Sequence, residues 1–389
     1  MKKLLLATLM GLMFGTAQAE DLTLTSDKTF KVYGLIDAGL VTVSNTGTKN
    51  GQANILLNGV QKSSRFGITG SQAIDENWTA GFKIEHQFMA SDGSNGSTGG
   101  GGVQNNFFNL NSYMYITNPA YGRLQVGRQN SIVYESEMQT DARGGQNFGG
   151  SLSFWAENAA FGGTSTAKTG VVSLGGGNQI NNVIRYDLPE FAGVKLSGMY
   201  VPGGVGGDDD ASAKKGLSVI YKGIDNLTLT ASGYWQNDAT GVETGRTWIV
   251  GGNYWMLDKK LNLAAGYISL ENPSKSGLAN SELSMKQLSA KYYVTPKFDI
   301  SGGWYKLDDE ITSANSARQL SLVGTYALGK NIDAFAGWAQ MKNSGNFGMA
   351  PFAQGALNYN TLATDYKSAV VTVPGQTHDA LMVGMQVRF

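Results

Sequence analysis

The chain has 389 residues, of which 30 are basic and 30 acidic, with no cysteine and 53 glycines. The balanced charge argues against a nucleic-acid partner, because nucleic-acid-binding proteins present strongly basic surfaces. A chain without cysteine also has no disulfide scaffold, so its stability must come from an extensive hydrogen-bonded architecture.

The first element in the chain is a predicted export signal. Lys2 and Lys3 precede an apolar stretch at 4–14, and a small-x-small cleavage site follows at 17–19. The apolar stretch is too short to cross a membrane as a helix, and no longer one follows it. We expect residues 1–19 to be a cleaved secretory signal peptide and residues 20–389 to form one mature domain.

The mature chain consists of short segments in which apolar and polar residues alternate, the period of a β-strand. About sixteen strands are expected, at 30–43, 59–71, 77–90, 105–118, 121–130, 179–188, 192–201, 213–222, 226–237, 245–256, 260–271, 281–294, 297–308, 316–328, 331–343 and 377–389.

The predicted connections are of two kinds, tight turns and long polar loops, in strict alternation. The long loops are expected at 44–58, 91–104, 131–178, 202–212, 238–244, 272–280, 309–315 and 344–376. Short turns at one rim and long loops at the other are typical of outer-membrane barrels, whereas a soluble β-sandwich would not need them. The sequence therefore predicts an all-β fold, a 16-stranded antiparallel transmembrane β-barrel, with both termini at the short-turn rim.

Strand parity separates a lipid-facing side from a lumen-facing side. In the last strand, Leu381, Val383, Met385, Val387 and Phe389 share one face, while glycine and polar residues alternate with them. Aromatic residues on the predicted outer face fall near strand ends, as expected of interfacial girdles. These are Trp235, Trp248, Tyr254, Tyr267, Tyr292, Trp304, Tyr326 and Trp338.

Six motifs occur in order along nearly the whole mature chain. They are VYGLIDAGL from Val32, SSRFGITGSQ from Ser63, WTAGFKIEHQF from Trp78, YGRLQVGRQN from Tyr121, NNVIRYDLPEFAG from Asn181 and the terminal VGMQVRF. In this order and spacing the sequence resembles the Gram-negative general porins, in particular the β-proteobacterial type. The resemblance implies a homotrimer in the outer membrane, with a water-filled channel in each subunit for passive diffusion of ions and small hydrophilic solutes.

The resemblance also implies a constriction. In the family the third long loop folds into the barrel, and here the third loop, 131–178, is the longest. Family arginines on the wall correspond to Arg65 and Arg128, and the loop acids expected to oppose them are Glu135, Glu137, Asp141 and Glu157. Parity adds Lys31, Lys83 and Lys195 as further wall cations.

Two features of the sequence complicate the prediction. Leu110 and Gln179 stand where the family often has arginine, so we expect only mild charge selectivity. Simple parity places Arg128 with the outward Leu124 and Val126, so its place in the lumen requires a bulge near Gly127 or the end of the strand there.

The resemblance further implies trimer contacts on the first and last strands, at Ile36, Ala38, Val383 and Met385. A glycine-rich second loop at 91–102 is expected to reach over the neighbouring subunit, and Phe389 to serve as the signal for the assembly machinery. Outer-membrane lipid and lipopolysaccharide are the expected surroundings.

No cofactor, metal or enzyme site is predicted. Only His86 and His378 are available as histidines, and neither has the sequence context of a catalytic or metal-binding cluster.

Two alternatives remain open at this point. A ladder of inward tyrosines (Tyr33, Tyr113, Tyr115 and Tyr234) is also consistent with a substrate-selective channel, which saturable flux of one solute would identify. The long loops are also consistent with a surface adhesin or antigen, which lack of conductance would favour.

Overall fold

A computed structural model describes residues 28–46, 51–91, 93, 95, 107–156, 179–352 and 374–389. The predicted signal peptide, most of the second loop and Glu157 lie outside these residues.

The described residues form one antiparallel sheet of 17 strands. The strands are β1 (Lys28–Thr46), β2 (Gly51–Asn58), β3 (Arg65–Ala73), β4 (Thr79–Gln87), β5 (Asn111–Asn118), β6 (Gly122–Asn130), β7 (Gln179–Asp187), β8 (Val194–Val201), β9 (Lys214–Tyr221), β10 (Leu227–Asn237), β11 (Glu243–Met256), β12 (Leu261–Glu271), β13 (Glu282–Thr295), β14 (Phe298–Asp309), β15 (Ser316–Gly329), β16 (Ile332–Ser344) and β17 (Thr377–Arg388). Three helices accompany them: α2 (Ile132–Glu137), α3 (Leu152–Ala156) and the 3₁₀ helix η3 (Pro273–Lys275).

The sheet closes on itself, because β1 pairs with β17 on one side and with β2 and β3 on the other. β2 and β3 pair with successive parts of β1, so they are two halves of one interrupted strand. Counted in this way, the sheet is a closed 16-stranded barrel, and the predicted fold is confirmed. A closed barrel satisfies its backbone hydrogen bonds without an exposed edge, as a bilayer requires.

Three predicted boundaries are wrong. The predicted strand 59–71 starts too early, because β3 begins at Arg65. The predicted first loop, 44–58, is mostly strand, because β1 continues to Thr46 and β2 begins at Gly51. The predicted strand 105–118 is too long, since β5 begins at Asn111. The error at β2 has a physical cause. Ala53, Ile55 and Leu57 face inward and are buried. The inner face of β2 is therefore apolar, whereas a strand that faces a water-filled lumen would carry polar residues on that face.

The outer face carries the expected apolar band. Val32, Leu40, Leu322 and Val383 are each more than half exposed on the isolated barrel. Several of the predicted girdle aromatics are also exposed there, namely Trp248, Tyr254, Tyr267, Tyr292 and Tyr326. Among the described residues, no helix is long and apolar enough to cross a membrane.

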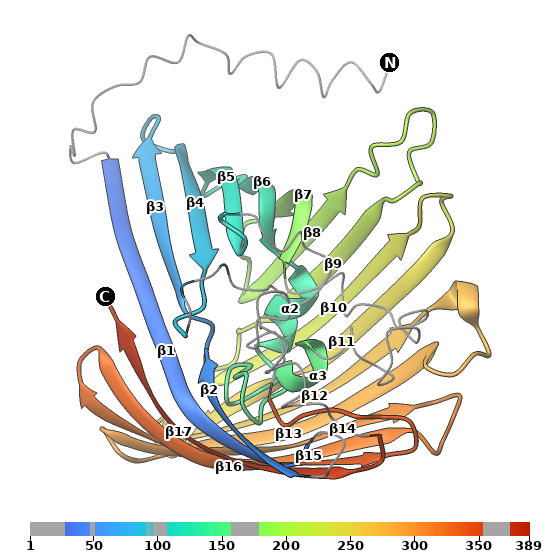
Figure 1. The fold of residues 1–389 in the computed structure, drawn as a ribbon. Coiled ribbons are helices and arrows are strands. Elements are labelled where there is room, and N and C mark those ends of the chain that lie inside the picture. The colour runs from blue at the N-terminus through green and yellow to red at the C-terminus, as the bar shows by residue number, and fades with distance from the viewer. Residues whose placement is uncertain are drawn as a thin grey trace.

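The lumen is partly filled by the chain itself. Figure 1 shows α2 and α3 inside the ring of strands. Buried apolar residues of these helices, such as Ile132 and Phe154, pack in one cluster with side chains on the inner wall, including Ile268 and Met285. The helices therefore occupy part of the space inside the barrel.

Candidate functional site

Residues 131–156, the inner loop, narrow the lumen. The loop begins where β6 ends, and Ser131 starts α2 by accepting a hydrogen bond from Tyr134 N at its side-chain oxygen (3.1 Å). Ile132 and Val133 on α2 are fully buried. The helix thus rests its apolar face on the wall and turns its other face toward the lumen.

Hydrogen bonds fasten the inner loop to the lumen face of β11–β15. They join Asn253 Nδ2 to Gln139 O (2.9 Å), Ala142 N to Ser289 Oγ (2.8 Å), Tyr305 OH to Asp141 Oδ1 (3.1 Å), and Ser153 Oγ to Gln319 Oε1 (2.8 Å). The close approach depends on a glycine on β12, because a Cβ at Gly266 would lie 2.7 Å from Thr140 Cβ.

The far end of the inner loop docks on the interruption between β2 and β3. Phe148 N donates to Val60 O (2.9 Å), and Asn147 N donates to Gln61 O (3.0 Å). On the opposite side, the buried Asp37 carboxylate accepts from the backbone N–H groups of Gln61 and Lys62. Hydrogen bonds on both sides therefore hold the interruption, residues 59–64, against the inner loop.

Arg143 holds the bend of the inner loop. Its guanidinium is buried and donates to Ser321 Oγ (3.0 Å), Gln146 Oε1 (2.7 Å), Phe148 O (2.8 Å) and Gly149 O. Within the part of the chain that the structure describes, it makes no ion pair. This arginine therefore ties loop to wall through hydrogen bonds alone.

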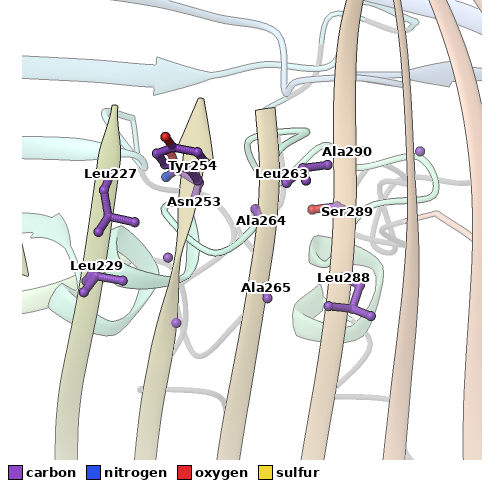
Figure 2. A pocket seen from close by; sticks show the side chains of 13 residues that line it. Leu227, Leu229, Asn253, Tyr254, Leu263, Ala264, Ala265, Leu288, Ser289 and Ala290 are labelled. Atoms are coloured by element: carbon purple, nitrogen blue, oxygen red, sulfur yellow. The ribbon is translucent and has the colours of Figure 1, made fainter. Parts of the chain in front are cut away.

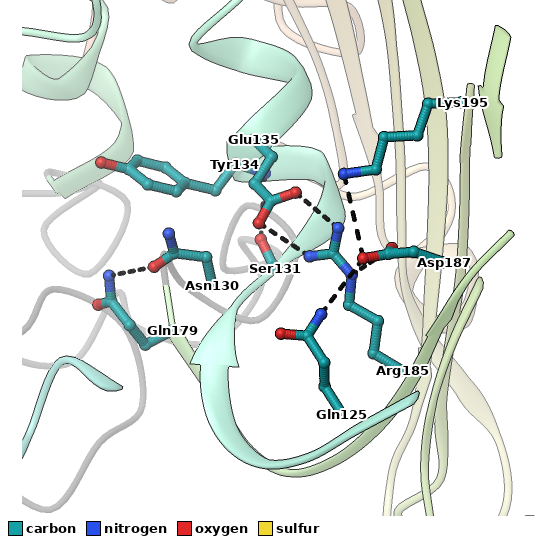
Figure 3. Close-up of polar contacts among 9 residues, drawn as sticks. All are labelled: Gln125, Asn130, Ser131, Tyr134, Glu135, Gln179, Arg185, Asp187 and Lys195. Atoms are coloured by element: carbon teal, nitrogen blue, oxygen red, sulfur yellow. Dashed lines mark hydrogen bonds and ion pairs between the residues drawn. The ribbon is translucent and has the colours of Figure 1, made fainter. Parts of the chain in front are cut away.

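Glu135 is the loop acid that reaches a wall arginine. Arg185 on β7 donates to both Glu135 carboxylate oxygens at 2.8 Å, and its Nε contacts Asp187 at 2.8 Å. Lys195 Nζ lies 4.0 Å from Asp187. Figure 3 shows these four side chains converging between α2 and the wall. A bidentate arginine–carboxylate pair has a specific geometry, so this pair holds α2 in a defined orientation relative to β7.

The other two described loop acids do not face the channel. Glu137 is 0 % exposed and Asp141 is 3 % exposed. Asp141 accepts from Tyr305, Ser151 and the backbone of Arg143. The resemblance implies that both acids oppose the wall arginines, whereas in this structure neither forms an ion pair with a described wall cation. Asp141 points into the contact between the loop and β14, and Glu137 lies within the loop itself, near Asp141 and Gly145.

Glu137 lies in an unusual environment. Neither carboxylate oxygen has a hydrogen-bond partner of normal geometry among the described residues. Burial, and then the nearby Asp141 carboxylate, raise the pKa of Glu137 well above its usual range. The neutral form is thus favoured in the folded protein.

A Glu137→Gln variant is expected to lose part of the pH dependence of stability. Because the folded state binds this proton more tightly than the unfolded state, wild-type stability falls as pH rises above about 4.5, the ordinary value for glutamate. The variant should therefore gain unfolding temperature relative to wild type as pH increases, measured by heat-modifiability in detergent. Glu190→Gln, on an exposed turn, is the control. Identical pH profiles for wild type and Glu137→Gln would contradict this.

The predicted wall cations divide into two groups. Arg65 lies opposite Leu35 and Gln87 on the inner face, and Lys31 is exposed on the same face of β1. Lys83 is instead paired with Glu85 at 3.4 Å. Arg65 thus has the lumen orientation that parity predicts.

Arg128 is placed differently from its prediction. It lies opposite the exposed Ser112 in the β5–β6 ladder, and it donates to Asn109 O (2.7 Å) and Asn181 Oδ1 (2.6 Å). A register shift does occur at Gly127, but its extra residue is on β7, so Arg128 keeps outward parity. Arg128 is therefore not part of the constriction in this structure.

Several lumen groups were not predicted. Lys62, in the interruption, is exposed and lies within electrostatic range of the cations Arg65, Lys291 and Arg388 and of the acid Asp37. Arg123 on β6 stacks over the Tyr115 ring at 3.7 Å. Parity could have found Arg123 and Arg185, because both alternate with apolar residues in quoted motifs. Lys62 could not be found in this way, since it lies outside regular strand.

The lumen charges are unevenly paired. Five described acids of the lumen are ion-paired: Glu85 with Lys83, Glu135 and Asp187 with Arg185, Asp299 with Lys291, and Asp333 with Arg388. Asp37 and Asp309 instead accept hydrogen bonds from backbone N–H groups. Lys31, Lys62, Arg65 and Arg123 make no ion pair with any residue that the structure describes. The lumen therefore presents four cations that no described acid pairs directly, although Asp37 lies within electrostatic range of Lys62, and Glu85 within that of Arg65.

Comparisons with known proteins agree with this architecture. The sequence model of Gram-negative porins matches residues 6–346. An outer membrane porin protein of Bordetella pertussis is 23% identical over 402 residues, covering 88% of this chain and 94% of the relative. The fold resembles an anion-selective porin from Comamonas acidovorans (TM-score 0.72, 18% identity, 93% and 100% coverage). It also resembles OmpT of Vibrio cholerae (TM-score 0.61, 13% identity, 95% and 100% coverage).

Proposed function

Since this chain belongs to the Gram-negative porin family, we propose that its outer-membrane diffusion channel favours small anions over cations of similar size. The observation that carries the proposal is the set of four lumen cations, Lys31, Lys62, Arg65 and Arg123, without ion-pair partners among the described residues. A pore with low-dielectric walls focuses the field of such fixed charges onto passing ions.

The burial of the loop acids strengthens this field. Glu137 and Asp141 are separated from the lumen, and Glu135 is engaged by Arg185. The inner loop thus adds steric narrowing while contributing little negative charge to the open path. The likeness in fold to an anion-selective porin from Comamonas acidovorans is consistent with the proposal.

Flux through proteoliposomes tests the proposal. Gluconate and glucosamine are similar in size and opposite in charge, and we expect gluconate to pass faster, with a rate linear in concentration. Faster glucosamine passage would contradict anion preference. Saturation by one solute would instead support the substrate-selective alternative.

We also propose that the channel assembles as a homotrimer after removal of residues 1–19. Ile36, Val383 and Met385 form an exposed apolar surface across β1 and β17, and Ala38 lies opposite Met385 in that ladder. Such a surface can face lipid or a neighbouring subunit.

N-terminal sequencing of the exported protein tests the cleavage, and the mature chain is expected to begin at Glu20.

Deleting Phe389 is expected to lower the amount of assembled trimer strongly. Phe389 exchanges both backbone hydrogen bonds with Gly34 (2.9 and 3.0 Å), and its ring covers that glycine, so it completes the seam between the two ends of the sheet. Heat-modifiable trimer in outer-membrane fractions is the measurement, and Phe389→Tyr is the control that keeps the aromatic ring. Normal trimer levels after deletion, or a wild-type protein that is only monomeric, would contradict the assembly account.

A further inference from the structure

The outer wall has an apolar hollow of about 710 Å³ over β10–β14, near the short-turn rim. Leu227 and Leu229 on β10, Leu263 on β12 and Leu288 on β13 stand around it, as Figure 2 shows. These side chains have outward parity, and three of them are more than 40 % exposed on the isolated barrel, namely Leu229, Leu263 and Leu288. The hollow therefore opens toward the membrane.

Small residues on neighbouring strands form the floor of the hollow. Gly252 on β11 lies opposite Ala265 on β12, and Ala290 on β13 lies opposite Gly302 on β14. Because these residues add little or nothing beyond the backbone, the surface recedes between the surrounding leucines. The depression thus follows from strand register and residue size together.

The chemistry of the lining specifies a hydrocarbon occupant. The walls are leucine and the floor is glycine and alanine, with Tyr254 at one end. Asn253 and Ser289 also border the hollow, but their side chains bond the inner loop on the lumen side of the wall. An apolar hollow does not hold water, and an unfilled one forfeits dispersion contacts. On a barrel in the outer membrane, the available hydrocarbon is a lipid acyl chain.

Positive charge lies where a lipid headgroup would be. The turn between β11 and β12 carries Asp258, Lys259 and Lys260, all exposed, so its net charge is positive, and neither lysine makes an ion pair with a described residue. Lys260 precedes Leu263 by three residues, which is about 10 Å along a strand. Short turns of such barrels face the periplasm, where the leaflet consists of phospholipids and lipopolysaccharide is absent.

We propose that this hollow is a binding site for an anionic phospholipid of the inner leaflet. One acyl chain fills the depression over Gly252, Ala265 and Ala290, and Lys259 and Lys260 attract the phosphate and the headgroup charge. Tyr254 and the exposed Tyr292 lie at the interfacial level between them, where an amphipathic ring is favoured. The inference rests on the outer-membrane location and is independent of the anion preference.

Photo-crosslinking in nanodiscs tests the site. Phosphatidylglycerol or phosphatidylcholine with a diazirine on one acyl chain is included, and crosslinked peptides are mapped by mass spectrometry. We expect phosphatidylglycerol to label β11–β13 severalfold more than phosphatidylcholine does. Filling the hollow with Ala265→Leu and Ala290→Leu should reduce this labelling severalfold. Ala231→Leu, an outward alanine on β10 outside the hollow, should leave it unchanged.

A second variant keeps the test decisive if the filled barrel does not assemble. Lys259→Gln with Lys260→Gln lies outside the strands and should reduce phosphatidylglycerol labelling to the phosphatidylcholine level. Equal labelling by the two lipids in the wild type overturns the proposal, as does labelling that persists after the hollow is filled. Labelling unchanged by the lysine substitutions, or preferential labelling by a lipopolysaccharide probe, also overturns it.

Discussion

Replacing Arg143 with alanine is expected to raise the single-channel conductance severalfold. The guanidinium donates hydrogen bonds to three oxygens of the inner loop and to Ser321 on the wall. Hydrogen bonds that involve a charged group contribute roughly 1.5–3 kcal/mol each, so losing the set should free the loop end that docks on the strand interruption. A released loop leaves a wider path for ions.

The measurement is conductance in planar bilayers, together with the size limit for neutral sugars. Arg318→Ala removes an exposed arginine from the same strand that carries Ser321, and it should leave both quantities unchanged. A trimeric Arg143→Ala channel with wild-type conductance and size limit would show that the inner loop is held without this residue.

Neutralising Lys62 and Arg65 together should move the permeability ratio toward cations severalfold. A unit charge about 4 Å from an ion is worth about 1 kcal/mol in bulk water, and more where the surroundings are less polar. A difference of about 1.4 kcal/mol changes an equilibrium tenfold. The shift should be largest at low salt, because screening is then weakest.

Two substitutions on the inner loop test whether every loop acid acts on permeating ions or only those that are not buried. Glu137→Gln should leave the permeability ratio unchanged, since that carboxyl is buried. Glu135→Gln should shift the ratio toward anions, because it leaves Arg185 with one carboxylate partner fewer. A large anion shift from Glu137→Gln, or an unchanged ratio in the Lys62 and Arg65 variant, would contradict the assignment.

The architecture could be predicted from sequence because most strands face lipid on one side and water on the other. That environment imposes period-two patterning, and parity correctly oriented Arg65, Lys83 and the outer aromatics. The rule failed at β2, where Ile55 and Leu57 face a lumen filled by the inner loop instead of water. The alternation of apolar and polar residues shows whether each face of a strand is apolar or polar. It does not show that a distant segment of the chain packs against the inner face.

The constriction was harder to predict for the same reason. Loop acids in a sequence are naturally expected to be solvated, yet Glu137 and Asp141 are buried. Asp141 accepts a hydrogen bond from Tyr305, and the approach of Thr140 to the wall requires Gly266, both more than a hundred residues away. Arg128 was misplaced because the bulge that parity required near Gly127 occurs on the partner strand β7. Long-range packing thus decides which charges reach the pore.

The zero-current potential of the wild-type channel in a potassium chloride gradient tests the central claim most directly. Lys31, Lys62, Arg65 and Arg123 are proposed to act on the open path, because no described acid pairs directly with them. We therefore predict a potential whose sign reports preferential chloride passage, growing as total salt is lowered. A potential of the opposite sign at low salt, from a trimeric channel of normal conductance, would contradict the account.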